Sequence, residues 1–149
     1  MDRVELLSPA GDLERLKTAF IYGADAVYIG GEIFGMRSAA KNFTIEEMAE
    51  GVEFAHARGK QVFVTLNIIP RNEEFEQLEM YLHELDRIGV DAVIVSDPGV
   101  FSVVKSTLPN MEIHISTQAS TTNAEAATFW YNLAIDVGGA MIYASFKML

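Results

Sequence analysis

The chain has 149 residues, half of them hydrophobic, and its 21 acidic residues outnumber 11 basic ones to give a formal net charge of −10. This length and composition indicate one folded domain with a core and exclude a disordered chain. So acidic a segment is unsuited to direct binding of nucleic acid or an anionic membrane, because phosphate binding needs clustered lysine and arginine.

The chain contains no cysteine, which excludes disulfides, cysteine nucleophiles, thiolate zinc sites and iron–sulfur ligation by this segment. We therefore expect no cofactor to be held by this segment. The absence also agrees with a cytoplasmic protein. We expect no signal peptide and no membrane partner, since the sequence offers neither a leader pattern nor a stretch apolar enough for a membrane span.

Short apolar segments alternate along the chain with segments of helical periodicity. We expect strands at about 3–8, 25–30, 61–68, 91–96 and 112–117. We expect helices between and after them at about 12–22, 45–58, 73–88, 98–108 and 123–133. Two helices carry start signals: Thr44 and Glu47 match a capping box, and Asp97-Pro98 matches an N-cap followed by proline. Strands and helices that alternate in series predict a parallel sheet with right-handed crossovers.

Two α/β architectures fit this order, a doubly wound open sheet and a TIM-barrel-like (β/α) fold. The central strands of a doubly wound sheet lie under helices on both faces and are apolar on both. In the strand at 112–117, however, Ile113 and Ile115 alternate with His114 and Ser116. A barrel fits this pattern better, because its interior face turns polar toward the catalytic end.

A complete barrel of this kind needs about 250 residues, and this chain has 149. We therefore expect an incomplete barrel with about five to six parallel strands. It would form a single partial domain over residues 1–149, the N-terminal portion of a larger architecture. Its unpaired strand edge would allow pairing with a second copy of the chain.

Active-site residues of such barrels lie at the carboxyl ends of the strands and in the loops that follow. The polar candidates at these ends are Asn67, Asp97, Ser116 and Gln118. The loop at about 30–43 is longer than most loops between a strand and a helix, and it contains Arg37, Lys41 and Asn42. It is either a substrate loop that binds a carboxylate or phosphate, or an ordinary surface loop.

His114 is the histidine that the pattern places on a strand, whereas His56 and His83 fall on expected helices among charged residues. Facing the barrel interior, His114 would serve as a general base or a metal ligand. The alternative is a core histidine that is hydrogen-bonded to its neighbours.

Glu5, on the first expected strand, would be a buried carboxylate if it faced the interior, with Arg37 or His114 as its partner. Ser116, His114 and Asp97 have the residue types of a serine-hydrolase triad. Two residues that are two apart on one strand face stand about 6–7 Å apart, which is too far for a direct hydrogen bond between Ser116 and His114. The sequence also lacks a G-x-S-x-G elbow and an H-E-x-x-H metal motif.

Five longer segments follow one another in the order ELLSPAGDLERLKTAFIYGADAVYIGG, FGMRSAAKNFT, VTLNIIPRNEE, DAVIVSDPGV and IHISTQASTTN. Together they resemble a bacterial family, the collagenase-like peptidases of family U32, over about residues 4–133. The resemblance implies a TIM-barrel-like N-terminal region of a larger protein with peptidase activity. It also implies an alternative, because other members resemble factors for oxygen-independent hydroxylation of transfer RNA, ribosomal RNA or a quinone precursor, some with an iron–sulfur cluster.

The family's cysteine-containing signature lies beyond the matched region, so an iron–sulfur cluster is implied only for full-length relatives. The resemblance carries over the polar positions Arg37, Asn42, Asn67, Asp97, His114, Ser116 and Gln118 as candidates. The tail at 134–149 departs from the family pattern, which a truncated or frameshifted gene would explain.

The first hypothesis is therefore a peptidase-family fragment that acts on a peptide, with no activity of its own as an isolated 149-residue chain. The second is an RNA- or quinone-hydroxylation factor, and the third is an inactive or accessory binding module. The catalytic candidates are His114, Ser116 and Asp97, and the substrate-binding candidates are Glu5, Arg37, Asn42, Asn67 and Gln118.

Overall fold

A computed structural model describes residues 4–35, 42–135 and 142–144 of the chain. Strands and helices alternate, as the sequence predicts. The strands are β1 (Leu7–Pro9), β2 (Ala26–Gly30), β3 (Gln61–Leu66), β4 (Ala92–Val95), β5 (Glu112–Ile115) and β6 (Ile142–Ala144). The helices are α1 (Leu13–Ile21), α2 (Ile45–His56), α3 (Phe75–Arg87), α4 (Pro98–Thr107) and α5 (Ala124–Ile135), with short 3₁₀ turns η1 (Asn72–Glu74) and η2 (Thr117–Ala119).

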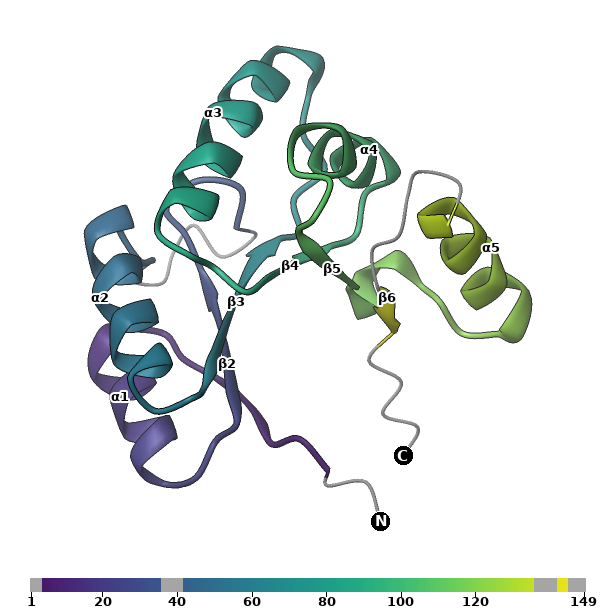
Figure 1. The fold of residues 1–149 in the computed structure, drawn as a ribbon. Helices are drawn as coiled ribbons and strands as arrows, with labels where there is room; N and C mark the ends of the chain where they lie inside the picture. Colours follow the sequence, from purple (N-terminus) through teal and green to yellow (C-terminus); the bar gives the residue numbers. More distant parts are fainter. Residues whose placement is uncertain (1–3, 36–41, 136–141, 145–149) are drawn as a thin grey trace.

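The strands form one parallel sheet in the order β1-β2-β3-β4-β5-β6, so each strand pairs with its neighbour in the chain. Figure 1 shows the helices in an arc outside the curved sheet. Sequential parallel strands with helices outside them are the arrangement of a TIM barrel and not of a doubly wound sheet. The prediction of an incomplete (β/α) barrel is confirmed.

The two faces of the sheet differ in composition. The convex face packs against the helices in the main core, to which the strands contribute Val27, Ile29, Val62, Val64, Leu66, Val93, Val95, Ile113 and Ile115. The concave face carries a smaller cluster of Ala26, Phe63 and Ala92, with the partly buried Leu7, Tyr28 and Ile94 against it. The alternation of Ile113 and Ile115 with His114 therefore has the predicted orientation, with the isoleucines under the helices.

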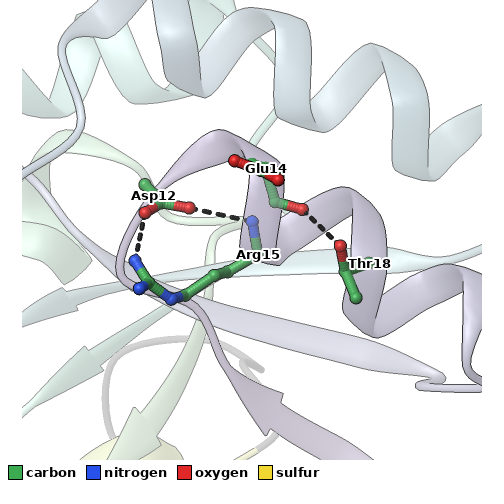
Figure 2. A network of polar contacts seen from close by, with 4 residues as sticks. All are labelled: Asp12, Glu14, Arg15 and Thr18. Atoms are coloured by element: carbon green, nitrogen blue, oxygen red, sulfur yellow. Dashed lines mark hydrogen bonds and ion pairs between the residues drawn. The ribbon is translucent and has the colours of Figure 1, made fainter.

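Side chains cap α2 and α4 at the expected positions, and a further cap lies at the start of α1. Thr44 and Glu47 form the predicted capping box of α2, and Asp97 Oδ1 accepts a hydrogen bond from Val100 N of α4 at 2.9 Å. Figure 2 shows the start of α1, where Asp12 Oδ1 accepts a hydrogen bond from Arg15 N at 2.8 Å and the Asp12 carboxylate also pairs with the Arg15 guanidinium. These caps fix where α1, α2 and α4 begin and so where the loops before them end.

Two aspartates join neighbouring strands at the opposite, N-terminal end of the sheet. Asp25 Oδ2 accepts a hydrogen bond from Leu6 N at 3.0 Å, and Asp25 Oδ1 lies 2.8 Å from Lys60 Nζ. Asp91 Oδ2 accepts one from Val62 N at 2.7 Å, and both Asp91 oxygens lie 3.1 Å from His56 Nε2. Each aspartate lies two residues after a glycine with positive φ. The repeated G-x-D-A-V pattern of residues 23–27 and 89–93 therefore has a structural role, which is to join neighbouring strands.

Several strand boundaries differ from the predictions, and those of β1 and β5 have a clear cause. β1 begins at Leu7 and not at residue 3, because Val4, Glu5 and Leu6 lie exposed ahead of the sheet. β5 ends at Ile115, because Ser116 caps the turn η2. β6 was not assigned to particular residues beforehand; it lies within the tail at 134–149, much of which is outside the described residues.

Large apolar side chains are exposed at both ends of the arc. Val4, Leu6, Ile21 and Tyr22 lie beside β1 and α1, and Phe129 and Tyr131 lie on α5. β1 and β6 are the edges of the sheet in the described part of the chain. Exposed apolar surface beside open strand edges is what an incomplete barrel leaves uncovered.

Candidate functional site

The candidate site is a row of polar side chains at the carboxyl ends of β2 to β5. We call Asn42, Thr65, Asn67, Ser96, His114 and Ser116 the polar rim. The register places Thr65 beside Ile94, and Ile94 beside His114, so these side chains share the concave face one layer below the strand ends. Barrel enzymes place their catalytic groups at this end of the sheet.

Asn42 and Thr65 both lie beside Gly30 at the end of β2. A Cβ atom on Gly30 would lie 3.5 Å from Thr65 Oγ1 and 3.9 Å from Asn42 Oδ1. The Thr65 hydroxyl donates to the Ile29 carbonyl oxygen at 3.1 Å, which leaves its oxygen as an acceptor. Both side-chain oxygens therefore lie close to the backbone of Gly30.

Asn67, Ser96 and Ser116 extend the polar rim over the next strands. Ser96 Oγ donates to the Asn67 carbonyl oxygen at 3.4 Å, and Ser116 N donates to the Val95 carbonyl oxygen at 2.7 Å. Ser116 Oγ accepts a hydrogen bond from Gln118 N at 3.2 Å. Gln118 belongs to the turn η2 and does not continue the face of β5, because the strand ends at Ile115.

His114 contacts Glu112 and Phe63 on the concave wall. Its Nε2 lies 2.7 Å from Glu112 Oε1, and its ring meets the Phe63 ring edge-on with centroids 4.6 Å apart. Only 6% of His114 is exposed. Glu112 is not among the predicted candidates, although its position two residues before His114 on the same strand places both side chains on one face.

The three catalytic candidates do not form a triad in the structure. His114 pairs with Glu112, whereas Ser116 and Asp97 cap the elements that follow β5 and β4. Glu5 is exposed ahead of β1 and is not the interior carboxylate considered above. Arg37 and Lys41 lie outside the described residues, so their proposed contact with an anion stays a prediction.

The base of the loop after β2 is fixed although its middle is not described. Gly31 pairs with Phe43 across the loop, Phe43 N donates to the Gly30 carbonyl oxygen at 3.0 Å, and Glu32 N donates to the Phe43 carbonyl oxygen at 3.3 Å. Phe34 adopts φ 63°, which brings its side chain into the core with its ring 5.7 Å from that of Tyr81. Both ends of the loop are therefore anchored beside Asn42.

Tyr81 supports this loop from below. Its hydroxyl is buried and points at Met48 Sδ at 3.8 Å. Burial, with a smaller contribution from the negative charge of Glu32, raises the pKa of Tyr81. Tyr81 is thus a neutral phenol at physiological pH, and its role at this position is packing.

The loop after β5 contains a buried hydroxyl group and a strained residue. Ser120 adopts a left-handed conformation with φ 53° and ψ 35°. Thr121 Oγ1 is buried and has no hydrogen-bond partner among the residues that the structure describes. Unsatisfied buried polar groups and unusual backbone conformations concentrate at functional sites.

We expect Thr121→Val to leave the free energy of unfolding unchanged or to raise it. The substitution keeps the shape of the side chain and removes a hydroxyl that forms no described hydrogen bond. Thr65→Val is the matched control and should cost about 1 kcal/mol, because Thr65 donates to Ile29. Urea unfolding measures both; a loss at Thr121 as large as at Thr65 would contradict the assignment.

The described part of the chain contains neither a candidate metal site nor a candidate membrane span. No three His, Cys, Asp or Glu side chains gather there in a way that could hold a metal ion. No helix in the described ranges is long and apolar enough to cross a membrane. A hollow of about 290 Å³ opens at the opposite end of the sheet, beside Asp86, Asp91 and Asn110, and so away from the polar rim.

A known protein family and several known proteins resemble this chain by sequence. A sequence model described as peptidase family U32 matches residues 11–137. The Bacillus subtilis "tRNA hydroxylation protein P1" is 51% identical over 132 residues, which are 89% of this chain and 31% of the relative. The Escherichia coli "23S rRNA 5-hydroxycytidine C2501 synthase" is 44% identical over 127 residues, 85% of this chain and 19% of the relative.

Another relative has a peptidase name. The "Uncharacterized protease MJ0090" of Methanocaldococcus jannaschii is 42% identical over 134 residues, 90% of this chain and 32% of the relative. The chain thus spans about a third or less of the length of the curated relatives named here.

Solved structures agree on the fold. The U32 peptidase Mk0906 superposes with a TM-score of 0.72 at 15% identity, over 94% of this chain and 67% of that one. A 2,3-dimethylmalate lyase superposes with a TM-score of 0.56 at 13% identity, over 93% of this chain and 57% of that one.

Proposed function

Because the chain belongs to peptidase family U32, and because relatives named for RNA hydroxylation match it over most of its length, we propose that it forms part of the barrel of an RNA hydroxylation protein. The single observation that carries the proposal is the 51% identity over 132 residues to a tRNA hydroxylation protein. This reverses the order of the sequence-based hypotheses, in which peptidase activity came first.

The proposed substrate is transfer RNA. Relatives named as tRNA hydroxylation proteins come from Bacillus subtilis, Helicobacter pylori, Escherichia coli and Haemophilus influenzae, and they are 34–51% identical over the matched segments. Ribosomal RNA is the second candidate, supported by the 44% identity to the 23S rRNA enzyme. Either substrate would place the protein in the cytoplasm.

The role of this segment is to form one wall of the base-binding site. The polar rim offers hydroxyl and amide groups that suit the edges of a nucleobase, and the half-buried Tyr28 and Ile94 offer an apolar surface to its ring. The phosphate backbone would be bound elsewhere in the whole protein. The outward surfaces of α2 and α3 are acidic, with Glu46, Glu50, Glu53, Glu76 and Glu79 exposed, and would repel phosphate.

This chain has no cysteine, and so an iron–sulfur cluster, if the whole protein uses one, would be ligated from outside this segment. The residues of the polar rim would bind and orient the base.

Peptidase activity is the second candidate and rests on the family name and on the name of one archaeal relative. The described geometry gives it less support. The serine at the end of β5 is not paired with His114, since its hydroxyl accepts a hydrogen bond from Gln118 N and caps a turn. A serine nucleophile needs a base within hydrogen-bond reach.

Deletion of the gene in its host tests the proposed function. We expect mass spectrometry of nucleosides from purified tRNA to show at least a tenfold loss of a hydroxylated nucleoside, restored by the intact gene. Nucleosides from 23S rRNA, measured in parallel, separate the two RNA substrates. Unchanged nucleosides in both RNAs, together with casein or collagen cleavage by the purified full-length protein, would favour the peptidase instead.

A further inference from the structure

Arg71 lies in the loop after β3, at the same carboxyl end of the sheet as the polar rim. It is exposed, and within the described ranges its guanidinium forms no ion pair, hydrogen bond or ring contact. The other lysines and arginines that the structure describes are occupied: carboxylates pair with Arg15, Lys17, Lys60 and Arg87, the Phe54 ring lies against Arg58, and Lys105 is buried. Among the described residues of this acidic chain, Arg71 is therefore the cation that remains available to a ligand.

Local hydrogen bonds hold the backbone of Arg71 in place. Arg71 N donates to Glu74 Oε2 at 2.6 Å, and Glu74 N donates to the Arg71 carbonyl oxygen at 2.9 Å. The Glu74 carboxylate is thus bound to the backbone and does not pair with the guanidinium. Pro70 fixes its own φ just before Arg71, and at the start of the loop the Asn67 carbonyl oxygen accepts a hydrogen bond from Ser96 Oγ at 3.4 Å. A loop ordered in this way loses little conformational entropy when it binds a ligand.

The loop keeps Arg71 close to the polar rim. Arg71 follows Asn67 by four residues, so the two Cα atoms lie within about 14 Å of each other. Ile69, between them, is 84% exposed. The loop therefore places an exposed apolar side chain and an unpaired guanidinium beside the hydroxyl and amide groups of the polar rim. A nucleotide has matching parts, because its base has polar edges, its ribose has an apolar face and its phosphate is an anion.

We propose that the loop of residues 67–71 binds the phosphate of the target nucleotide through Arg71, with Ile69 against the ribose. The proposal rests on the proposed function for the identity of the ligand as RNA. A guanidinium matches the geometry of phosphate and binds it with two parallel hydrogen bonds. Phosphate contacts position a nucleic acid without reading its sequence, so Arg71 fixes where the base lies relative to the polar rim.

The acidic surface beside the loop limits this site to one phosphate. Glu76 and Glu79 are exposed on α3, which begins four residues after Arg71, and their negative charges repel further phosphates. The rest of the RNA backbone would therefore lie against parts of the whole protein outside this segment. A single available arginine at the border of an acidic surface allows the phosphate one position and so sets the register of the strand.

The first test needs no enzymatic activity. In the ¹⁵N-labelled 149-residue chain, the Arg71 Nε–H signal and the Ile69 amide signal should shift when cytidine 5′-monophosphate is added, and Arg71 should not respond to cytidine. The Arg87 Nε–H signal is the internal control, because Arg87 Nη2 already pairs with Glu84 Oε2 at 2.6 Å. Equal shifts of Arg71 with both compounds, or no shift with the monophosphate, would overturn the assignment.

The second test measures binding of unmodified tRNA from the deletion strain to the full-length protein. We expect Arg71→Gln to weaken binding about 10-fold, the effect of one hydrogen bond to a charged group. It should also reduce the slope of log affinity against log salt by about 0.7–0.9, which corresponds to one phosphate. Arg87→Gln, the matched control, should keep the wild-type affinity and slope. If folded Arg71→Gln binds tRNA with the wild-type affinity and slope, this inference fails; if the wild type neither binds nor hydroxylates RNA, the proposed function fails and the spectra decide on the phosphate site.

Discussion

Gly31→Ala is expected to destabilise the chain by about 3 kcal/mol, the upper part of the range for overpacking. A Cβ atom on Gly31 would lie 2.0 Å from the Tyr81 hydroxyl oxygen and 2.8 Å from Met48 Cε. Met48 can move the end of its flexible side chain, but Tyr81 is 6% exposed and packed against Phe34. The variant must therefore displace either α3 or the base of the loop after β2.

A double-mutant cycle isolates this contact. Tyr81→Phe removes the nearest atom and only a weak hydrogen bond to sulfur, so alone it should change stability by less than about 1 kcal/mol. Combined with Gly31→Ala it should restore at least about 1 kcal/mol, as directly contacting residues do. Gly30→Ala is the matched control, because its Cβ would meet nothing nearer than 3.5 Å. Additive effects of the two substitutions in urea unfolding would contradict this account.

Lys105→Met is expected to stabilise the chain by roughly 1–3 kcal/mol at neutral pH, the cost of an unsatisfied buried polar group. Lys105 is 2% exposed, and its Nζ has no hydrogen-bond partner in the described ranges. It lies one helical turn after Phe101, whose ring packs 5.7 Å from that of Trp130. Methionine fills a similar volume without a charge.

The stabilisation that Lys105→Met gives should decrease as the pH rises. Burial lowers the pKa of Lys105 in the folded chain, whereas the unfolded chain keeps the ordinary value of 10.5. Between these two values the unfolded state binds more protons, so the free energy of unfolding of the wild type rises with pH. The advantage of Lys105→Met should thus be greatest at and below neutral pH and shrink toward pH 10.5.

Lys17→Met is the control for this experiment. Lys17 Nζ pairs with Glu50 at the surface, where substitution changes stability little and adds no comparable pH dependence. Urea unfolding at several pH values between 6 and 10 measures both variants. A constant difference between Lys105→Met and the wild type across that range would show that the lysine keeps its ordinary titration in the fold.

The architecture could be predicted from the sequence because the local signals agree with the global fold. Helical periodicity, the capping box at Thr44 and the N-cap at Asp97 each specify one boundary. The alternation at Ile113 to Ile115 placed the isoleucines under the helices and His114 on the concave face. Such signals depend on residues close together in the chain, which is why they were visible.

The candidate site could be predicted from the sequence only in part. The pattern predicted that Ser116 continues β5, but its hydroxyl forms a local hydrogen bond that starts a turn. Serine side chains often form such bonds with nearby backbone groups, and these bonds compete with the hydrogen bonds of a strand. The contact between Gly31 and Tyr81 joins residues 50 apart in the chain, and no local pattern encodes it. Burial of Lys105 could not be expected either, since lysine is almost never fully buried.

The most direct test of the proposed function is a chimera. The 132-residue matching segment of the Bacillus subtilis tRNA hydroxylation protein P1 would be replaced by this chain, in a strain that lacks both P1 and the related P2. We predict that the chimera restores the hydroxylated nucleoside in tRNA, measured by mass spectrometry. A folded, expressed chimera that leaves the nucleoside absent would contradict the account.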